Sequence, residues 1–125
     1  MDLGVCMEHE VDNLLNDLSK IDGVIKVAII NNITKKIERC VNMHDRCDAL
    51  VQAMSDVVRV NMKYSRLTEK YNEIEDTLIT YRDEIHLLKP LFRTAKYFIY
   101  INISRGANIA LTRLKLNETL EFYLK

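Results

Sequence analysis

The chain has 125 residues, of which 48% are hydrophobic and 29% are charged, and its formal net charge is zero. This length and composition are typical of a soluble globular chain, so we expect one domain over residues 1–125. The balanced charge argues against a strong electrostatic pull toward nucleic acid or an anionic membrane, and it does not oppose self-association.

The sequence contains no apolar run long enough to span a bilayer. Its first residues lack the cationic start and the apolar core of a secretory signal. The three cysteines show no pattern of a small secreted domain, which favours reduced thiols. We therefore expect a cytoplasmic protein with no direct membrane insertion.

The first predicted element is an amphipathic helix from about residue 7 to residue 20, with apolar residues on one face and acids and amides opposite. Gly23 ends this helix, because glycine is the usual residue just past a helix C-terminus. The β-branched run at residues 24–30 then indicates a buried strand.

A turn and a second strand follow. Asn31 and Asn32 favour a turn, because asparagine tolerates the left-handed region of the backbone. The second strand is expected at about residues 35–41, with Ile37 and Val41 on one face and charged residues on the other. This weakly apolar strand is predicted to lie at a sheet edge, where its cationic residues discourage aggregation.

The longest predicted helix runs from about residue 45 to residue 71, a segment without glycine or proline. Its apolar stripe consists of Leu50, Met54, Val57, Val58 and Met62. Its second half carries a cationic row, made of Arg59, Lys63, Arg66 and Lys70. Such a row is either a solvated face that complements the helix dipole or a docking surface, and the row alone favours the first interpretation.

Three more strands are predicted in the second half of the chain. Residues 77–81 and 85–88 flank a charged turn and indicate a hairpin, which ends near Pro90 because proline cannot donate to a strand ladder. Residues 97–103 are β-branched and aromatic on both faces, which is typical of a strand in the middle of a sheet.

The last element is a helix that begins near Ala107, after a turn in which Gly106 is expected to take a positive φ. Its apolar residues at helical spacing are Ile109, Ala110, Leu114, Leu116, Leu120 and Leu124. The order of elements is helix–strand–strand–helix–strand–strand–strand–helix. This order favours an antiparallel sheet with helices on its faces, an α+β fold.

No catalytic pattern is recognisable. The three glycines are isolated, so the sequence has no phosphate-binding loop. His86 stands alone in a strand, which favours a packed or hydrogen-bonded histidine over a catalyst. The acids before the hairpin favour a solvated turn over a pair of catalytic carboxylates: Glu69, Glu73, Glu75 and Asp76. We expect no enzyme, no catalytic residue, no cofactor and no nucleic-acid partner.

One constellation could bind a metal, because thiolates and imidazoles at short spacing are zinc ligands. It comprises Cys40, His44 and Cys47, with Cys6 and His9 earlier in the chain. The spacing of Cys40 and Cys47 is not a standard zinc spacing. We therefore interpret these cysteines as small half-buried residues beside a loop and expect no metal.

Two stretches resemble the Roadblock / dynein light-chain family. Gly23 and Val24, followed by residues 27–30, are similar to its first strand. The segment NIALTRL is similar to its last helix, which Asn108 begins and in which Arg113 comes one turn later. The asparagine turn stands where the family usually has an Asp/Gly turn. By element order the resemblance covers nearly the whole chain.

The resemblance implies a five-stranded antiparallel sheet in one roadblock-like domain, with strand 97–103 beside strand 24–30 in the middle. The long helix would lie on one face and the other two helices on the opposite face. Family members are typically dimers joined through the third strand and the long helix. The corresponding interface residues here are Leu78, Ile79, Tyr81, Met54, Val58 and Met62.

The family's roles are non-enzymatic: its members bind Ras-like small GTPases and modulate their nucleotide state, or serve as scaffold and dynein light-chain subunits. We therefore expect a homodimer, or a dimer with a related roadblock protein, that regulates such a GTPase. The predicted partner-binding residues are Arg59, Lys63, Tyr64 and Arg66. A structural subunit of a larger assembly is the alternative, and a small ligand- or metal-binding sensor is the least favoured interpretation.

Overall fold

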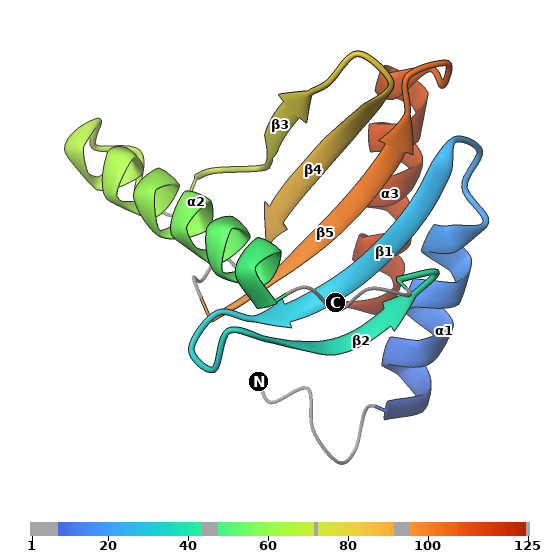
Figure 1. Ribbon diagram of the computed structural model, residues 1–125, viewed down its shortest axis with the longest axis horizontal. Coiled ribbons are helices and arrows are strands. Elements are labelled where there is room, and N and C mark those ends of the chain that lie inside the picture. Colours follow the sequence, from blue (N-terminus) through green and yellow to red (C-terminus); the bar gives the residue numbers. More distant parts are fainter. Residues whose placement is uncertain (1–7, 44–47, 72, 92–95, 125) are drawn as a thin grey trace.

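The computed structural model describes residues 8–43, 48–71, 73–91 and 96–124. They form one antiparallel sheet with the strand order β2-β1-β5-β4-β3, together with three helices (Figure 1). The elements are α1 (Glu8–Ser19), β1 (Val24–Asn31), β2 (Lys36–Val41), α2 (Asp48–Leu67), β3 (Thr77–Thr80), β4 (Glu84–Pro90), β5 (Tyr97–Ser104) and α3 (Ile109–Tyr123). The predicted α+β fold and the predicted order of its elements are confirmed.

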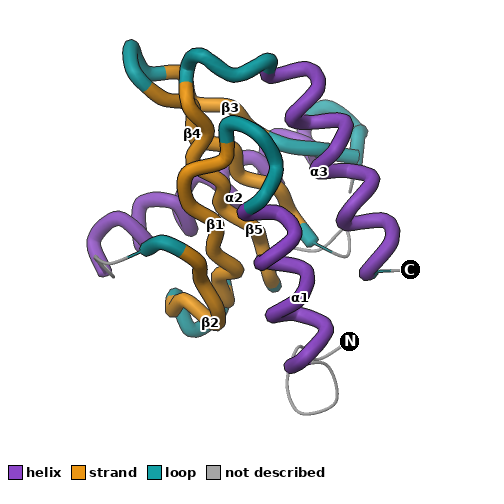
Figure 2. The backbone as a smooth tube through the Cα atoms, turned by 90° about the vertical axis from the view of Figure 1, so that its right-hand side faces the viewer, coloured by secondary structure: helices purple, strands orange, loops and turns teal. Residues whose placement is uncertain are grey.

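Strand β5 lies in the middle of the sheet, as its apolar sequence predicts, and pairs with β1 on one side and β4 on the other. Seven of its eight residues are buried, because both faces of the strand are covered. Helices α1 and α3 lie side by side on one face, and α2 lies on the other (Figure 2). The predicted arrangement of three layers is therefore confirmed.

The larger part of the core lies between the sheet and the α1/α3 layer. Leucines of α1 and α3 pack there against alternate residues of β1, β4 and β5. The fully buried side chains of this layer include Leu14, Leu15, Leu18, Leu87, Ile101 and Leu116. Alternation along each strand sends the remaining side chains to the α2 face.

Helix α2 buries a narrower set of residues against the opposite face of the sheet. Its sheet-facing side consists of Val51, Met54, Ser55, Val58 and Ser65. The predicted stripe is right for Met54 and Val58 and wrong for Leu50, which is exposed while the neighbouring Val51 is buried. Both positions hold an apolar residue, so spacing alone did not decide which one faces the sheet.

The predicted end of the long helix at residue 71 is wrong, because the helix stops at Leu67. Glu69 has a φ of 61°, its N–H donates to the carbonyl of Arg66, and the N–H of Lys70 donates to the carbonyl of Ser65. These two hydrogen bonds form a Schellman cap. A glutamate takes the place usually held by glycine, so the sequence gives no stop signal.

Strand β2 is at the sheet edge as predicted, but Ile37 and Val41 do not share a face. An irregularity in the pairing of β1 with β2 shifts the register between Ile29 and Ile30. As a result, Val41 packs in the α1/α3 layer and Ile37 packs in the α2 layer. Arg39, two residues before Val41, points to the same α1/α3 side, since its Nε lies 3.4 Å from an oxygen of Asp12 on α1.

The turn between β1 and β2 forms at the predicted place by a different device. Asn31 Oδ1 accepts hydrogen bonds from the N–H groups of Ile33 and Thr34, which closes the turn. The residue in the left-handed region is Lys35, with a φ of 58°, and not an asparagine. The side chain of Asn31 therefore supports the turn while Lys35 carries its unfavourable backbone angle.

Of the two turn glycines, Gly23 has the positive φ, at 92°, and the prediction of a positive φ for Gly106 is wrong. A Cβ on Gly23 would lie 2.3 Å from the Cβ of Ala107, so glycine is also required there by close packing.

Asn108 caps α3, because its Oδ1 accepts from the N–H of Leu111. Leu114, which helical spacing groups with the apolar residues of α3, is exposed to solvent.

One ion pair links α3 to the start of β3. Arg113 donates from Nε and Nη2 to the two carboxylate oxygens of Asp76, each at 3.0 Å. The side chain of Asp76 is only 7% exposed, so the prediction that it belongs to a solvated turn is wrong. The bidentate geometry fixes the residue that directly precedes the edge strand.

We predict that Asp76→Asn lowers the free energy of unfolding by about 1–2 kcal/mol, because Arg113 loses its charged partner in a mostly buried pair. Denaturant unfolding of the variant and the original chain measures this difference. The matched control is Asp56→Asn, which breaks an exposed pair with Arg59 and should cost less than about 0.5 kcal/mol. Equal losses in the two variants would contradict a structural role for the Asp76–Arg113 pair.

Candidate protein-interaction site

Helix α2 presents residues on every side, and about 100° of rotation per residue separates them into four sets. One set faces the sheet and is buried, as described above. The flank toward β3 is identified by Asn61, whose Nδ2 donates to Oγ1 of Thr77 at 2.5 Å. The remaining two sets, the outward side and the flank away from β3, are exposed. Figure 1 shows the second half of α2 extending beyond the strands.

The outward side of α2 is apolar. Val60, Tyr64 and Leu67 are 63%, 67% and 75% exposed, and their spacing of four and three residues places them in one row. We call these three residues the outward row. Large apolar groups gathered on a helix surface are typical of a protein-binding patch. Tyr64, one of the four predicted partner-binding residues, lies in this row beside the cations, and its part in partner binding stays a prediction.

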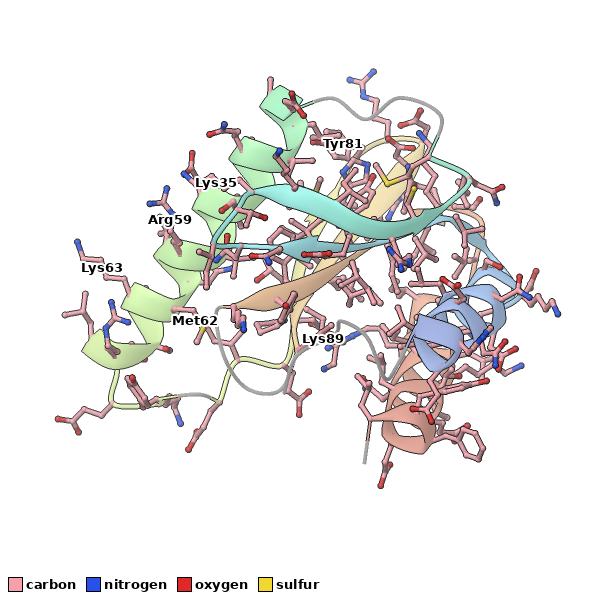
Figure 3. The ribbon with its side chains drawn as sticks, turned by 90° about the horizontal axis from the view of Figure 1, so that it is seen from below. Lys35, Arg59, Met62, Lys63, Tyr81 and Lys89 are labelled. Atoms are coloured by element: carbon pink, nitrogen blue, oxygen red, sulfur yellow. The ribbon has the colours of Figure 1, made fainter. Side chains whose placement is uncertain are left out.

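The flank away from β3 is cationic. Arg59 and Lys63 lie there (Figure 3), and helical spacing places Arg66 on the same side; we call these three residues the cationic flank. All three are exposed, and Arg59 pairs with Asp56 one turn earlier. Because Asn61 marks the opposite flank, the cationic flank points away from the edge strand.

Strand β3 forms the free edge of the sheet, since it pairs with β4 and lies last in the strand order. Leu78 and Tyr81 are 38% and 48% exposed, and Ile79 is half-buried. The N–H of Tyr81 donates toward β4, so alternation directs the N–H groups of Leu78 and Thr80 outward. An exposed apolar edge of this kind is a template for pairing with another strand.

The predicted interface residues do not all lie at this edge. Leu78, Ile79 and Tyr81 do, whereas Met54 and Val58 are buried against the sheet within one chain. Met62 is half-buried beside them. The place of all six residues in a dimer interface stays a prediction. Because Met54 and Val58 are buried, they could act in such an interface only by packing under the residues that contact the partner.

A polar cluster lies on the α2 face of the sheet next to the hairpin turn. The carboxylate of Glu84 accepts a hydrogen bond from Nδ2 of Asn102 and one from Nε2 of His86, each at 3.0 Å. The His86 ring lies 4.8 Å from Tyr81 and meets Tyr100 edge-on at 5.3 Å. His86 is thus packed and hydrogen-bonded, as its sequence position predicts.

The pKa values of Glu84 and Tyr100 do not suit acid–base catalysis. The hydrogen bonds from Asn102 and His86 lower the pKa of Glu84, so its carboxylate stays ionised at neutral pH. Burial, and then the charge of Glu84, raises the pKa of Tyr100 to about 12, so its hydroxyl stays protonated. Neither group has a pKa near the working pH that a general acid or base needs.

The ligand-binding hypotheses have little geometric support. His44, Cys47 and Cys6 lie outside the described residues, and the described part of the chain holds no group of three ligands able to bind a metal.

A cavity of about 790 Å³ lies between the segment before β3, the end of β4 and α3. Its charged lining residues are Glu73, Glu75, Lys89 and Glu121. The Nζ of Lys89 donates to the backbone carbonyl of Glu75 at 2.9 Å, so this lysine is tied to the wall of the cavity.

None of the helices in the described ranges is long and apolar enough to cross a membrane.

Comparison with known proteins identifies the fold. No family model and no curated protein matches the sequence. Myxococcus xanthus MglB matches with a TM-score of 0.81 at 9% identity, over 97% of this chain and 90% of MglB. A Roadblock/LC7 domain from Streptomyces avermitilis matches with a TM-score of 0.74 at 9% identity, over 89% and 92% of the two chains.

A structure of MglB with a tetrameric arrangement also matches, with a TM-score of 0.74 at 10% identity, over 96% of this chain and 88% of that one. At these identities the likeness is one of fold. The chain has the roadblock fold, and the resemblance predicted from residues 23–30 and 108–114 is confirmed at that level.

The lowered pKa of Glu84 predicts a pH dependence of stability. A carboxyl whose pKa is lower in the folded state stabilises the fold above its unfolded pKa, and this contribution is lost as the pH falls through the folded pKa. Between about pH 6 and pH 3, Glu84→Gln should therefore lose less stability than the original chain. Denaturant unfolding at a series of pH values measures the two slopes, and parallel slopes would contradict the assignment.

Proposed function

We propose that this chain is a non-enzymatic, dimeric regulator or adaptor of a Ras-like small GTPase. The observation that carries the proposal is the separation of surfaces on α2 and β3. The free edge of β3 offers a site for self-pairing, while the cationic flank lies on the other side of α2. A dimer formed through β3 therefore leaves the cationic flank free for a second protein.

The dimer part of the proposal follows from the edge strand. Pairing of β3 with its symmetry mate would satisfy the outward N–H groups of Leu78 and Thr80 and would cover Tyr81. Such an interface is isologous, because the same surface of both copies takes part. MglB, a structural neighbour, is known in a tetrameric arrangement, which supports self-assembly as a property of the fold.

The GTPase part rests on the family resemblance together with the surface of α2. The outward row supplies an apolar centre, and the cationic flank supplies a charged rim beside it. An apolar centre with a polar rim is the usual anatomy of a protein–protein interface. Among the described residues no catalytic group is assembled, so a regulator of this kind would act by reshaping the partner's switch regions.

A structural subunit of a larger assembly is the second candidate. It is favoured by further exposed apolar residues on α3, namely Leu111, Leu114 and Phe122. They lie in the α1/α3 layer, on the opposite face of the sheet from α2. Recovery of a large stable complex without a GTPase would select this candidate.

Light scattering should give a mass near twice the chain mass of 14.6 kDa. Thr80→Pro should shift the protein toward the monomer, because it removes an N–H that points out from the edge. The matched control is Thr80→Ala, which keeps this N–H and should remain dimeric. A strict monomer for the original chain would contradict the dimer, and an unaffected Thr80→Pro dimer would contradict the proposed edge.

Immobilised protein should retain a small GTPase of the same organism, with an affinity that differs between its GDP-bound and GTP-bound states. Changing both Lys63 and Arg66 to glutamate should weaken binding by about tenfold or more, because like charges then face the partner's surface. Lys115→Glu, on α3, alters charge on the other layer and should have little effect. No binding, together with no change in hydrolysis or exchange, would refute the proposed function.

A further inference from the structure

Lys35 occupies a backbone position that does not suit lysine. It ends the turn between β1 and β2 with a φ of 58°, in the left-handed region that glycine and asparagine adopt most readily. Its N–H donates to the carbonyl of Asn31, so the turn imposes this conformation. A residue held in an unfavourable conformation points to a role for its side chain.

The turn is fixed to α2, and this fixes where Lys35 lies. The hydroxyl of Ser55, which is fully buried on α2, donates to Oδ1 of Asn32. The backbone N–H of Asn32 donates to the carbonyl of Lys96 at 2.8 Å. With Asn32 held from two sides, Lys35 lies on the side of α2 that carries Arg59, and Lys63 follows one turn further along the helix (Figure 3).

Lys35 therefore adds a cation from a different element to the cationic flank. Among the described residues, Asp56 pairs with Arg59, and neither Lys35, Lys63 nor Arg66 forms a salt bridge. We propose that Lys35 and the cationic flank form one surface that binds an acidic segment of a partner protein. This inference deepens the proposed function and rests on it, since it names the chemistry of the partner at the same surface.

The observations favour a protein segment over an anionic membrane. The cations follow one flank of a helix and one turn, which matches a linear acidic segment better than a flat lipid surface. Only four cations take part, and the chain as a whole carries no net charge. Each cation near an anionic membrane contributes only about 1 kcal/mol, so this set gives weak membrane attachment.

The test uses Lys35→Gly, because glycine keeps the positive φ and removes the cation. A fluorescent peptide of alternating glutamate and serine serves as the acidic segment, and its anisotropy measures binding at low salt. The variant should bind it about threefold more weakly, as expected for the loss of one charge contact at the surface. Its thermal unfolding midpoint should rise, since the strain of a non-glycine residue is removed.

The matched control is Lys115→Ala, which removes one exposed cation from α3 and should leave peptide binding unchanged. Lys35→Asn, which also tolerates the left-handed region, should reproduce the loss seen with Lys35→Gly. Equal affinity of the Lys35 and Lys115 variants would overturn the proposal. So would binding of the original chain to phosphatidylserine vesicles without binding to the peptide.

The same measurements separate this inference from the proposed function. Peptide binding that depends on Lys35, in a protein that retains no GTPase, supports the acidic-segment surface and refutes only the GTPase partner. GTPase retention that is unaffected by Lys35→Gly and unaffected by added acidic peptide refutes the surface and leaves the proposed function intact.

Discussion

Strands β1 and β5 pair at the centre of the sheet, and both are closed to water on both faces over most of their length. This pairing requires a cover on each side of the sheet, because apolar side chains alternate between the two faces. Helices α1 and α3 together cover one face. Among the described residues, α2 alone covers the other face; it packs over part of that face and extends beyond the strands. Exposed apolar residues nevertheless lie on both layers, in the outward row of α2 and at Leu111, Leu114 and Phe122 of α3.

The layers of the fold could be predicted because their signals are local. The run at 97–103 is apolar on both faces, and the structure places it at the centre of the sheet. Errors arose where distant contacts decide the outcome. Ile37 and Val41 lie on opposite faces because the pairing with β1 is irregular. In the turn between β1 and β2, Lys35 and not an asparagine has the positive φ, because hydrogen bonds to Oδ1 of Asn31 shape the turn.

The candidate site could be predicted in part. The cationic flank follows from helical spacing alone, and the edge strand follows from the hairpin and the family resemblance. The outward row was missed, although a second apolar stripe opposite the first is visible in the spacing of Val60, Tyr64 and Leu67. Its detection from sequence requires knowing which stripe faces the sheet. Asp76 was misassigned because its partner Arg113 is 37 residues away.

Two polar links hold the turn between β1 and β2 and the start of β3 in place. The bond between Ser55 and Asn32 fixes the turn that carries Lys35, and the Arg113–Asp76 pair fixes the start of β3. A surface held in this way loses little conformational freedom when a partner binds, so less of the contact energy is spent on ordering. The second link also begins in α3, on the opposite side of the sheet. A protein that binds α3 and displaces Arg113 would therefore alter the edge strand without touching it, which physically connects the two layers of the molecule.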